Sequence, residues 1–358
     1  MSLQRAIDTL NGEPTDRVAL LEWNAPPQFL LEATDVDPYE EPEEAWLSFL
    51  EMFDIDATLR GRTGIPKTRD GGVRRDGHYA YTQWGLGETS WLVDPVYKTP
   101  EEILAFDPRT HDRSSLQEKV DNFCKSYETV RERYGDRVLY IPGHYRLVLH
   151  YMPFWCDWQV FMEVLALEPE KCRPLFDRCE SYSIEVIEAW SHSSTPAFIA
   201  HEDLCSARGP IFSPDFLRRE IFPRYRRIYE PLKRRGIKVL ATSDGLIEPI
   251  AKDFLDAGAD GLFIEPMNDI GKMVELVEPG GVLWGGGSSV VVTTGTPRTI
   301  REDVRRRMEQ ARSLPRFFFA LGGEALHNVP SENFQAYLDA CSEFGFWKKS
   351  VNRQNLTL

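Results

Sequence analysis

The sequence predicts an α/β fold, a single (β/α)8 barrel that spans residues 1–358. Eight short runs rich in β-branched or aromatic residues end in polar residues or glycine, and six of them lead directly into helix-like sequence. Eight strands that alternate with helices are the count of such a barrel, whose active site lies at the C-terminal ends of the strands. The predicted strands are 17–23, 56–61, 137–143, 196–203, 238–245, 261–266, 282–288 and 316–323.

The polar residues at the ends of these runs also support a barrel with an active site at its strand ends. They read Glu-Trp, His-Glu-Asp, Ser-Asp-Gly, Glu-Pro, Gly-Gly-Gly-Ser and Gly-Gly-Glu. Buried strand ends with no function would not be this polar. The tails therefore indicate where chemistry should be sought.

The segments between the runs complete the barrel and add two inserts. Residues 71–93 alternate in polarity and carry glycine-rich turns, which predicts a β-hairpin or meander inserted after the second strand. Residues 143–192 predict a helical insertion after the third strand, whose aromatic stretch could be core packing or an apolar wall over a ligand pocket. Helices are predicted over 2–12, 42–53, 114–134, 215–235, 246–257, 270–277, 297–312 and 332–344.

Composition narrows the function classes. The net charge of −14 disfavours nucleic acid and anionic membrane surfaces, because both would repel the protein. Six cysteines without a C-x-x-C pair predict reduced thiols in a cytoplasm. The N-terminus does not have the pattern of a signal peptide, and no stretch approaches the apolar length of a membrane span. We expect a cytoplasmic protein that acts on a small molecule.

Three stretches resemble the uroporphyrinogen decarboxylase superfamily. Residues 201–224 begin His-Glu-Asp and continue through a Gly-containing loop, Ser-Pro and a helix ending in Pro, like the family's fourth-strand signature. Residues 236–268 resemble its fifth strand, helix and sixth strand, and 285–338 resemble its Gly-Gly segment, Gly-Thr-Pro helix start and V-P-x-E-N helix. The opening RAIDTLNGEPTDRVAL also fits. The resemblance implies one barrel and a homodimer.

The decarboxylase members of this superfamily carry arginines after the first strand that hold substrate carboxylates. Here the same place reads Glu22-Trp23-Asn24-Ala25-Pro26-Pro27, and Gly323 stands where those members have a histidine near the eighth strand. Bidentate recognition of carboxylates by guanidinium is not replaced by tryptophan or asparagine. Decarboxylation of uroporphyrinogen itself is therefore disfavoured.

The superfamily also includes corrinoid-linked methyltransferases. Their zinc motif has His-x-Cys at the end of the fifth strand and a cysteine near the eighth, whereas this chain has Thr242-Ser243-Asp244 and Gly322-Gly323-Glu324. A thiolate-rich zinc site is thus not expected. Related proteins that act on methylated amines and methoxyaromatics need a proton donor for the leaving group, which strand-end carboxylates and histidines would suit.

The candidate catalytic residues are Asp203, Asp244 and Glu265, each at a strand end. Asp203 could instead cap the turn that follows it, and Asp244 could serve the sharp turn that glycine permits in Ser-Asp-Gly. Strand alternation sends Glu202 to one side and His201 with Asp203 to the other, although at a strand terminus two of the three could face the pocket.

A second group of residues is expected to bind metal or substrate. His201 and His327 are the candidate metal ligands; with Asp244 and Glu265 they would make a nitrogen-and-oxygen site for Zn²⁺ or another divalent ion, although His327 could equally be a solvated loop residue. Glycines after the seventh strand could cradle phosphate or let a neighbour approach closely. The expected substrate-binding residues are Trp23, His144, Tyr145, Glu202, Arg208, Ser243, Gly287 and Ser288.

These observations favour methyl transfer from a small methylated compound, such as a methylamine or a methoxyaromatic, to a corrinoid on a partner protein. Decarboxylation of a tetrapyrrole-like or smaller acid and a non-catalytic binding barrel are the alternatives. The pocket should distinguish them: a metal or converging carboxylates would favour transfer, a buried arginine cluster would favour decarboxylation, and an apolar plug would favour neither.

Overall fold

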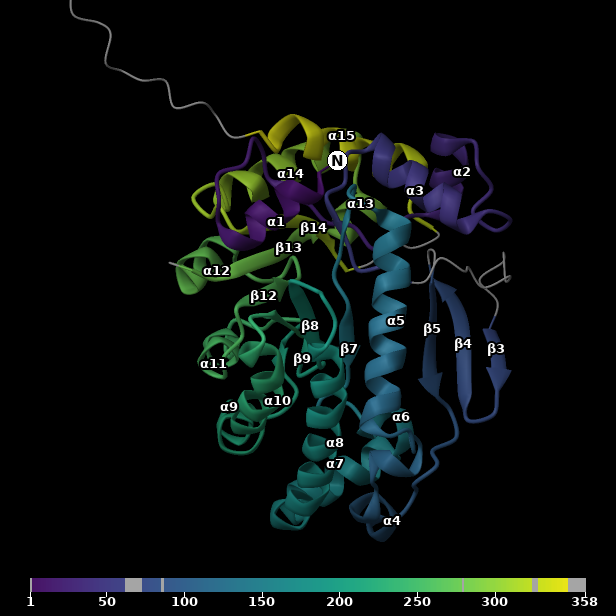
Figure 1. Cartoon of the computed structure of the whole chain (residues 1–358), viewed down its shortest axis with the longest axis vertical. Coiled ribbons are helices and arrows are strands. Elements are labelled where there is room, and N and C mark those ends of the chain that lie inside the picture. The colour runs from purple at the N-terminus through teal and green to yellow at the C-terminus, as the bar shows by residue number, and fades with distance from the viewer. Residues whose placement is uncertain (1, 62–72, 85–86, 279, 324–327, 347–358) are drawn as a thin grey trace, which may run out of the picture.

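The predicted barrel is present in the computed structural model (Figure 1), which describes residues 2–61, 73–84, 87–278, 280–323 and 328–346. Seven of its strands form one parallel sheet in the order β1-β14-β13-β12-β11-β8-β7. These strands are β1 (Ala19–Leu20), β7 (Gly143–Tyr145), β8 (Ala197–His201), β11 (Lys238–Thr242), β12 (Gly261–Ile264), β13 (Val282–Ser288) and β14 (Phe317–Gly322).

The barrel closes through two further short strands, β2 (Ala57–Thr58) and β6 (Leu139–Tyr140), which pair with each other in parallel. A parallel bridge between Leu21 and Ala57 joins β1 to β2. β6 and β7 are two parts of the predicted third strand, which is interrupted at Pro142 because proline has no N–H to donate to a neighbouring strand. The Pro142 carbonyl still accepts a 2.9 Å hydrogen bond from the Ile199 N–H, so the strand continues past it. Each of the eight predicted strands therefore has its counterpart.

The barrel interior is filled by side chains. One buried cluster includes Leu240, Phe263 and Trp284 from β11, β12 and β13, together with Leu21 and Ile141 directly after β1 and β6. The other faces of the strands pack against the helices in a second, larger cluster. Helix α1 (Leu3–Asn11) contributes Ala6 and Leu10 to the interior cluster. Inward and outward side chains alternate, so one strand supplies both layers.

The helices around the sheet follow the predicted order, but two of them differ in extent, and the short helices α2 (Pro27–Thr34) and α13 (Ser289–Thr294) were not predicted. The helix predicted over 215–235 is divided into α9 (Pro214–Phe216), a π-helical turn η3 (Leu217–Ile221) and α10 (Phe222–Arg234). The helix predicted from residue 246 begins later, as α11 (Ala251–Asp256). The other helices around the sheet are α2 (Pro27–Thr34), α3 (Pro42–Met52), α5 (Leu116–Tyr134), α8 (Arg173–Ser191), α12 (Ile270–Val277), α13 (Ser289–Thr294), α14 (Pro297–Gln310) and α15 (Ser331–Phe344).

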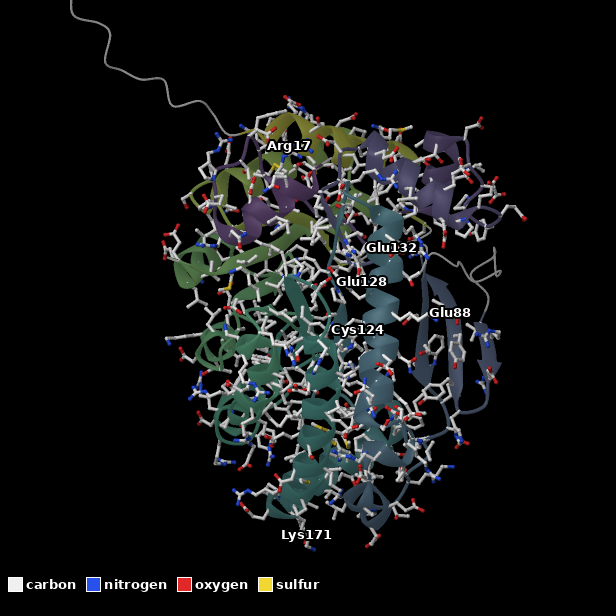
Figure 2. The ribbon with its side chains drawn as sticks, viewed as in Figure 1. Arg17, Glu88, Cys124, Glu128, Glu132 and Lys171 are labelled. Atoms are coloured by element: carbon white, nitrogen blue, oxygen red, sulfur yellow. The ribbon has the colours of Figure 1, made fainter. Side chains whose placement is uncertain are left out.

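An antiparallel sheet lies between β2 and α4 (Pro100–Ala105) in the sequence. It consists of β3 (Val73–Asp76), β4 (Tyr79–Trp84) and β5 (Gly87–Leu92) in the order β3-β4-β5. Figure 2 shows Glu88 on β5 of this sheet. The hydroxyl of Tyr79 donates to the carbonyl of Phe154 in helix α6 (Met152–Trp155), so the sheet is tied to the segment after the third barrel strand.

That segment is helical and continues through α7 (Trp158–Leu167) and the 3-10 turn η2 (Pro169–Cys172) into α8. A two-residue hairpin, β9 (Cys205–Ser206) with β10 (Gly209–Pro210), follows the end of β8. Within the described residues, no helix is both long enough and apolar enough to cross a bilayer.

Candidate active site

A cavity of about 800 Å³ opens at the C-terminal ends of the barrel strands. Its floor is aromatic: Trp23 lies edge-on to Phe263 and to Trp284, with ring centroids 6.0 and 5.9 Å apart. The residues around it are Trp23, Leu59, Glu88, Thr89, Ser90, Trp91, Leu92, Tyr145, His150, Pro153, Phe154, Ile199, His201, Thr242, Asp244, Phe263, Glu265, Trp284 and Gly323.

Strand register explains why side chains from distant segments meet here. β7 pairs with β8 so that Tyr145 lies opposite His201, and β8 pairs with β11 so that His201 lies opposite Thr242. Parallel strands end at the same edge of a sheet, so residues at matching positions of neighbouring strands become neighbours in space.

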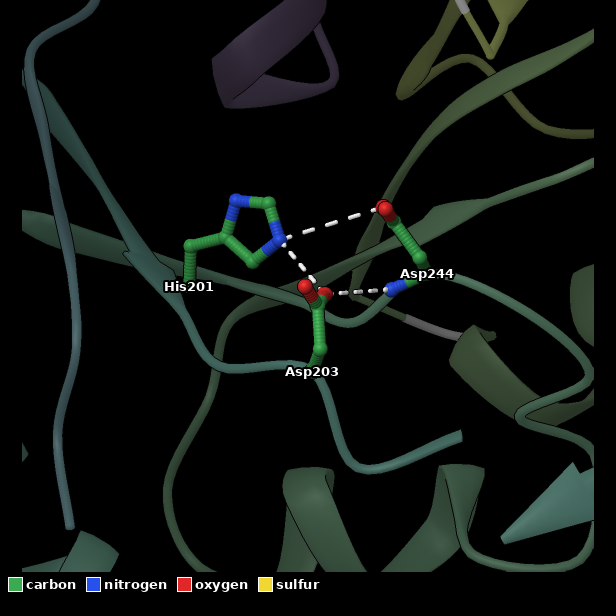
Figure 3. Close-up of side chains that lie close together, drawn as sticks. All are labelled: His201, Asp203 and Asp244. Carbon is green, nitrogen blue, oxygen red and sulfur yellow. Dashed lines mark hydrogen bonds and ion pairs between the residues drawn. The ribbon is translucent and has the colours of Figure 1, made fainter. Parts of the chain in front are cut away.

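His201 and Asp244 form the polar centre of the cavity, and Asp203 contacts both of them from outside the lining (Figure 3). Nε2 of His201 lies 2.9 Å from Oδ1 of Asp203 and 3.8 Å from Oδ1 of Asp244. The backbone N–H of Asp244 donates to Oδ1 of Asp203 over 3.1 Å, and the Tyr145 hydroxyl donates to Oδ2. Both oxygens of Asp203 are therefore already hydrogen-bonded.

The two carboxyl groups differ in acidity. Burial alone would raise the pKa of Asp203, but hydrogen bonds from His201 and Tyr145 lower it below its usual range. Burial raises the pKa of Asp244 to about 6, and the negative charge of Asp203 adds to this effect. The Asp244 side chain is 58 % exposed, but the exposure is to the cavity, whose protein walls still limit its hydration.

Two more ionisable groups face the cavity. Oε2 of Glu265 accepts a 2.6 Å hydrogen bond from the backbone N–H of Gly245, which places its carboxyl beside the Asp244 turn. His150 has Nε2 3.8 Å from Oδ2 of Asp203, and burial lowers the pKa of this imidazole to about 4. His150 is therefore neutral near pH 7.

The donor atoms of His201, Asp203 and Asp244 lie within 4.8 Å of one another. One imidazole and two carboxylates are a ligand set that suits Zn²⁺ or another divalent ion. An ionised carboxylate can only accept a hydrogen bond, so Nε2 of His201 carries the hydrogen directed at Asp203. A metal would therefore have to displace that hydrogen, with small shifts of the three side chains.

The sequence of residues 84–344 matches the model of the uroporphyrinogen decarboxylase (URO-D) family. The chain belongs to the uroporphyrinogen decarboxylase family. It is by that membership a uroporphyrinogen decarboxylase-like enzyme, and the barrel agrees with the fold of the family.

Solved structures are similar in fold. A methyltransferase from Methanosarcina mazei superimposes with a TM-score of 0.69 at 18% sequence identity, covering 96% of this chain and 99% of that chain. A putative vitamin-B12 independent methionine synthase from Listeria monocytogenes reaches a TM-score of 0.45 at 12% identity, covering 91% of this chain and 95% of that one. A search of curated proteins found no significant match. At 18% identity the likeness to the Methanosarcina mazei protein concerns the fold.

Five of the residues expected from the sequence line the cavity of this URO-D family member. They are Trp23, Tyr145, His201, Asp244 and Glu265. Asp203 lies behind them and contacts His201 and Tyr145. His327 lies outside the described residues.

The structure places Glu202 away from the cavity, against the expected substrate contact. It is 1% exposed, and its Oε1 accepts backbone hydrogen bonds from Leu147, Val148 and His150 at 3.1, 2.6 and 2.7 Å. The Tyr225 hydroxyl donates to its other oxygen. Strand alternation turns Glu202 toward the helices, where it holds the segment that carries His150.

The other expected substrate contacts also fall outside the cavity wall. His144 alternates with Tyr145, so it points to the opposite side of β7. Arg208 is exposed in the β9–β10 turn. Ser243 accepts from the Leu204 N–H, and Ser288 caps α13 by accepting from Val291. A Cβ on Gly287 would lie 2.8 Å from the carbonyl oxygen of Ala320, so this glycine permits close approach between strands. Glu22, next to Trp23, is buried against Tyr337 instead of meeting a ligand.

Sequence reasoning missed His150, Thr242 and the β5 residues 88–92. Thr242 ends β11, within the strand predicted over 238–245, and could have been found by counting alternation back from Asp244. The other residues belong to the inserts, where no barrel rule assigns a direction to a side chain. The only feature of the sequence that singles out His150 is that it is an ionisable residue within an aromatic segment.

Proposed function

We propose that this URO-D family member is a methyltransferase that removes a methyl group from a small methylated compound, such as a methylamine or a methoxyaromatic, and delivers it to a corrinoid carried by a partner protein. One observation carries the proposal. Carboxyl groups and histidines converge beside aromatic rings at the barrel mouth, and the described residues that line this cavity include neither lysine nor arginine.

The same observation weighs against the alternatives. A decarboxylase of this family needs cations to hold substrate carboxylates, and Asp244 and Glu265 would repel them. Arg146 lies beside the cavity, but its guanidinium stacks on the ring of Phe154 at 4.4 Å and does not line the cavity. A non-catalytic barrel would be expected to fill its mouth with apolar side chains, whereas a large cavity remains open here.

The chain's own residues would act by orientation and proton transfer. The aromatic floor would hold the donor so that its methyl group points out of the barrel, and such positioning can supply most of the barrier reduction in a displacement. The methyl–heteroatom bond breaks with its electron pair staying on the heteroatom. A quaternary or protonated ammonium donor then leaves as a neutral amine, whereas a methoxyaromatic leaves as a phenolate whose oxygen requires a proton, which the Asp244 carboxyl is placed to hold. The corrinoid would supply the nucleophile that accepts the methyl group.

A divalent cation, in the first instance zinc, is part of the proposal. His201, Asp203 and Asp244 would hold it, since their donor set and mutual distances fit. When bound, such an ion would polarise the departing heteroatom as a Lewis acid and would take the place of the Asp244 proton, because a carboxylate that holds a metal is ionised. The residues around it would still have to orient the donor and exclude water.

Methyl transfer can be tested with free cobalamin in its reduced Co(I) state as the acceptor, because its absorbance changes on methylation. The donors should include trimethylamine, choline and a methoxybenzoate. We expect at least one to react, and Asp244→Asn to lower the rate by about 100-fold where a general acid is needed. Asp215→Asn, whose side chain is 92% exposed on α9, is the matched control. Absence of transfer from all donors, with porphyrinogen or smaller acids decarboxylated instead, would overturn the proposal.

A further inference from the structure

Two buried polar atoms in the cavity wall lack a partner. Oγ1 of Thr242 and Nε1 of Trp284 make no hydrogen bond within the part of the chain that the structure describes. The two residues are only 4% and 2% exposed, and both line the cavity. Buried polar groups are nearly always hydrogen-bonded, so these two atoms point to a ligand that completes them.

The chemistry of these atoms limits what the ligand can offer. An indole N–H is a donor only, so Trp284 requires an acceptor atom, and the Thr242 hydroxyl can donate to one as well. The ligand should therefore bring an oxygen such as a hydroxyl or a carbonyl to the cavity floor.

The rest of the cavity favours a positive charge on the same ligand. The ring of Trp23, which is only partly buried, presents aromatic surface to the cavity and packs edge-on against the buried rings of Phe263 and Trp284. Aromatic faces attract methylated ammonium groups, and tryptophan does so most strongly. The carboxyl groups of Asp244 and Glu265 lie at the same cavity.

The other charged groups near the cavity do not cancel the attraction of Asp244 and Glu265 for a cation. Glu88 is paired with Arg74 at 3.1 Å, and Asp203 is hydrogen-bonded to His201, so these two carboxylates contribute less to the attraction of a cation into the cavity. Arg146 is held against Phe154 outside the lining. Asp244 and Glu265 remain as the carboxyl groups that face the open space.

We infer that the cavity binds a small methylated ammonium compound that also carries a hydroxyl or carbonyl oxygen. The ammonium lies against the aromatic rings and the two carboxyl groups, and the oxygen accepts from Trp284 and Thr242. This inference names the substrate class of the proposed methyl transfer and rests on it for the ligand's role as methyl donor. The binding itself can be measured without turnover.

Three ligands separate the two contributions, and the first two are nearly equal in shape. Choline has the cation and the oxygen, 3,3-dimethylbutan-1-ol has the oxygen without the charge, and tetramethylammonium has the charge without the oxygen. Calorimetric titration of the full chain in EDTA, so that no divalent ion masks the carboxylates, should show choline binding at least tenfold more tightly than either of the others.

Variants assign each contribution to a residue. Thr242→Val should lower choline affinity toward that of tetramethylammonium and leave tetramethylammonium affinity unchanged, with Thr294→Val on α13 as the control. Trp23→Leu should lower the affinity of both cations about tenfold and spare the neutral alcohol, with Trp158→Leu as the control outside the lining. Circular dichroism should first show that every variant is folded.

The inference is overturned if the neutral alcohol binds as well as choline, or if no ammonium compound binds. Methyl transfer from a methoxybenzoate without binding of choline would overturn this inference and leave the proposed function standing. Binding of choline without methyl transfer to cobalamin from any donor would overturn the proposed function and leave this inference about binding standing.

Discussion

The backbone N–H of Asp244 donates a 3.1 Å hydrogen bond to Oδ1 of Asp203, which joins the end of β11 to the loop after β8. This bond connects the two acidic residues of the candidate site although 41 positions separate them in the chain. It also orients Asp203 so that its second oxygen accepts from Tyr145. The site is thus built from hydrogen bonds between strand ends.

Zinc binding is the first prediction. Protein treated with EDTA and then dialysed should bind about one Zn²⁺ per chain in a calorimetric titration, because three donor atoms can close around one ion. His201→Ala should weaken binding at least tenfold, whereas His192→Ala on the outer surface should not. Equal binding by both variants would exclude this group of residues as the zinc site.

Glu202 should be important for stability. Glu202→Ala leaves three buried backbone N–H groups without their acceptor, so we expect unfolding in urea to require about 3–5 kcal/mol less free energy. Tyr225→Phe removes one hydrogen bond to the same carboxylate and should cost about 1–2 kcal/mol. A loss below 1 kcal/mol for Glu202→Ala would show that the segment 147–150 is held by other contacts.

Gly245 should resist any side chain. Its φ is +86°, and a Cβ there would lie 2.4 Å from the carbonyl oxygen of Ser206. Gly245→Ala should therefore destabilise the fold by about 2 kcal/mol or more and displace Asp244, lowering ligand affinity. Gly236→Ala has a similar φ of +73° but open space around the new Cβ, and should cost about 1 kcal/mol. Similar losses of stability in both variants would mean that the positive φ angle alone, and not the contact with Ser206, determines the cost of a side chain.

Glu22 should make stability depend on pH. Burial raises its pKa to about 8, although hydrogen bonds such as that from the Tyr337 hydroxyl at 2.6 Å oppose the shift. A raised pKa means that the folded protein retains a proton that the unfolded chain loses. The contribution of Glu22 to the free energy of unfolding is complete below the pKa that this group has in the unfolded chain, and it declines as pH rises from there through about 8.

Glu22→Gln removes that dependence. We expect the variant to be more stable than the original chain above pH 8, by about 1–3 kcal/mol, and to show a flatter stability profile between pH 5 and 9. Urea unfolding at each pH is the measurement. Parallel profiles for the two proteins would indicate that Glu22 is ionised in the folded state throughout.

Much of the fold was predictable from local patterns. Each of the eight runs ends in polar residues or glycine, and each corresponds to a strand of the barrel or to its two parts at β6 and β7. Alternation also predicted that Glu202 would lie opposite His201 and Asp203. The division of the helix after residue 213 by a π-helical turn was not predicted, because one extra residue in a turn leaves no signature in hydrophobic spacing.

The site was predicted less completely, for an identifiable reason. Residues such as Asp244 and Glu265 were found because the barrel rule assigns function to strand ends. His150 and Trp91 were missed because they lie on inserts, and their position depends on how Glu202 and Tyr79 anchor those inserts. Such contacts join segments far apart in the chain, and no local pattern encodes them.

The sequence by itself determined the barrel, the strand ends that carry carboxylates and the absence of decarboxylase-type arginines after the first strand. These properties follow from periodicity and residue type, which are local. Only the tertiary structure decided that Asp203 is held by His201 and Tyr145, that Glu202 serves the backbone, and that Thr242 and Trp284 lack partners. Whether a polar group is satisfied depends on register between strands and on the surrounding side chains, which are fixed only when the whole chain folds.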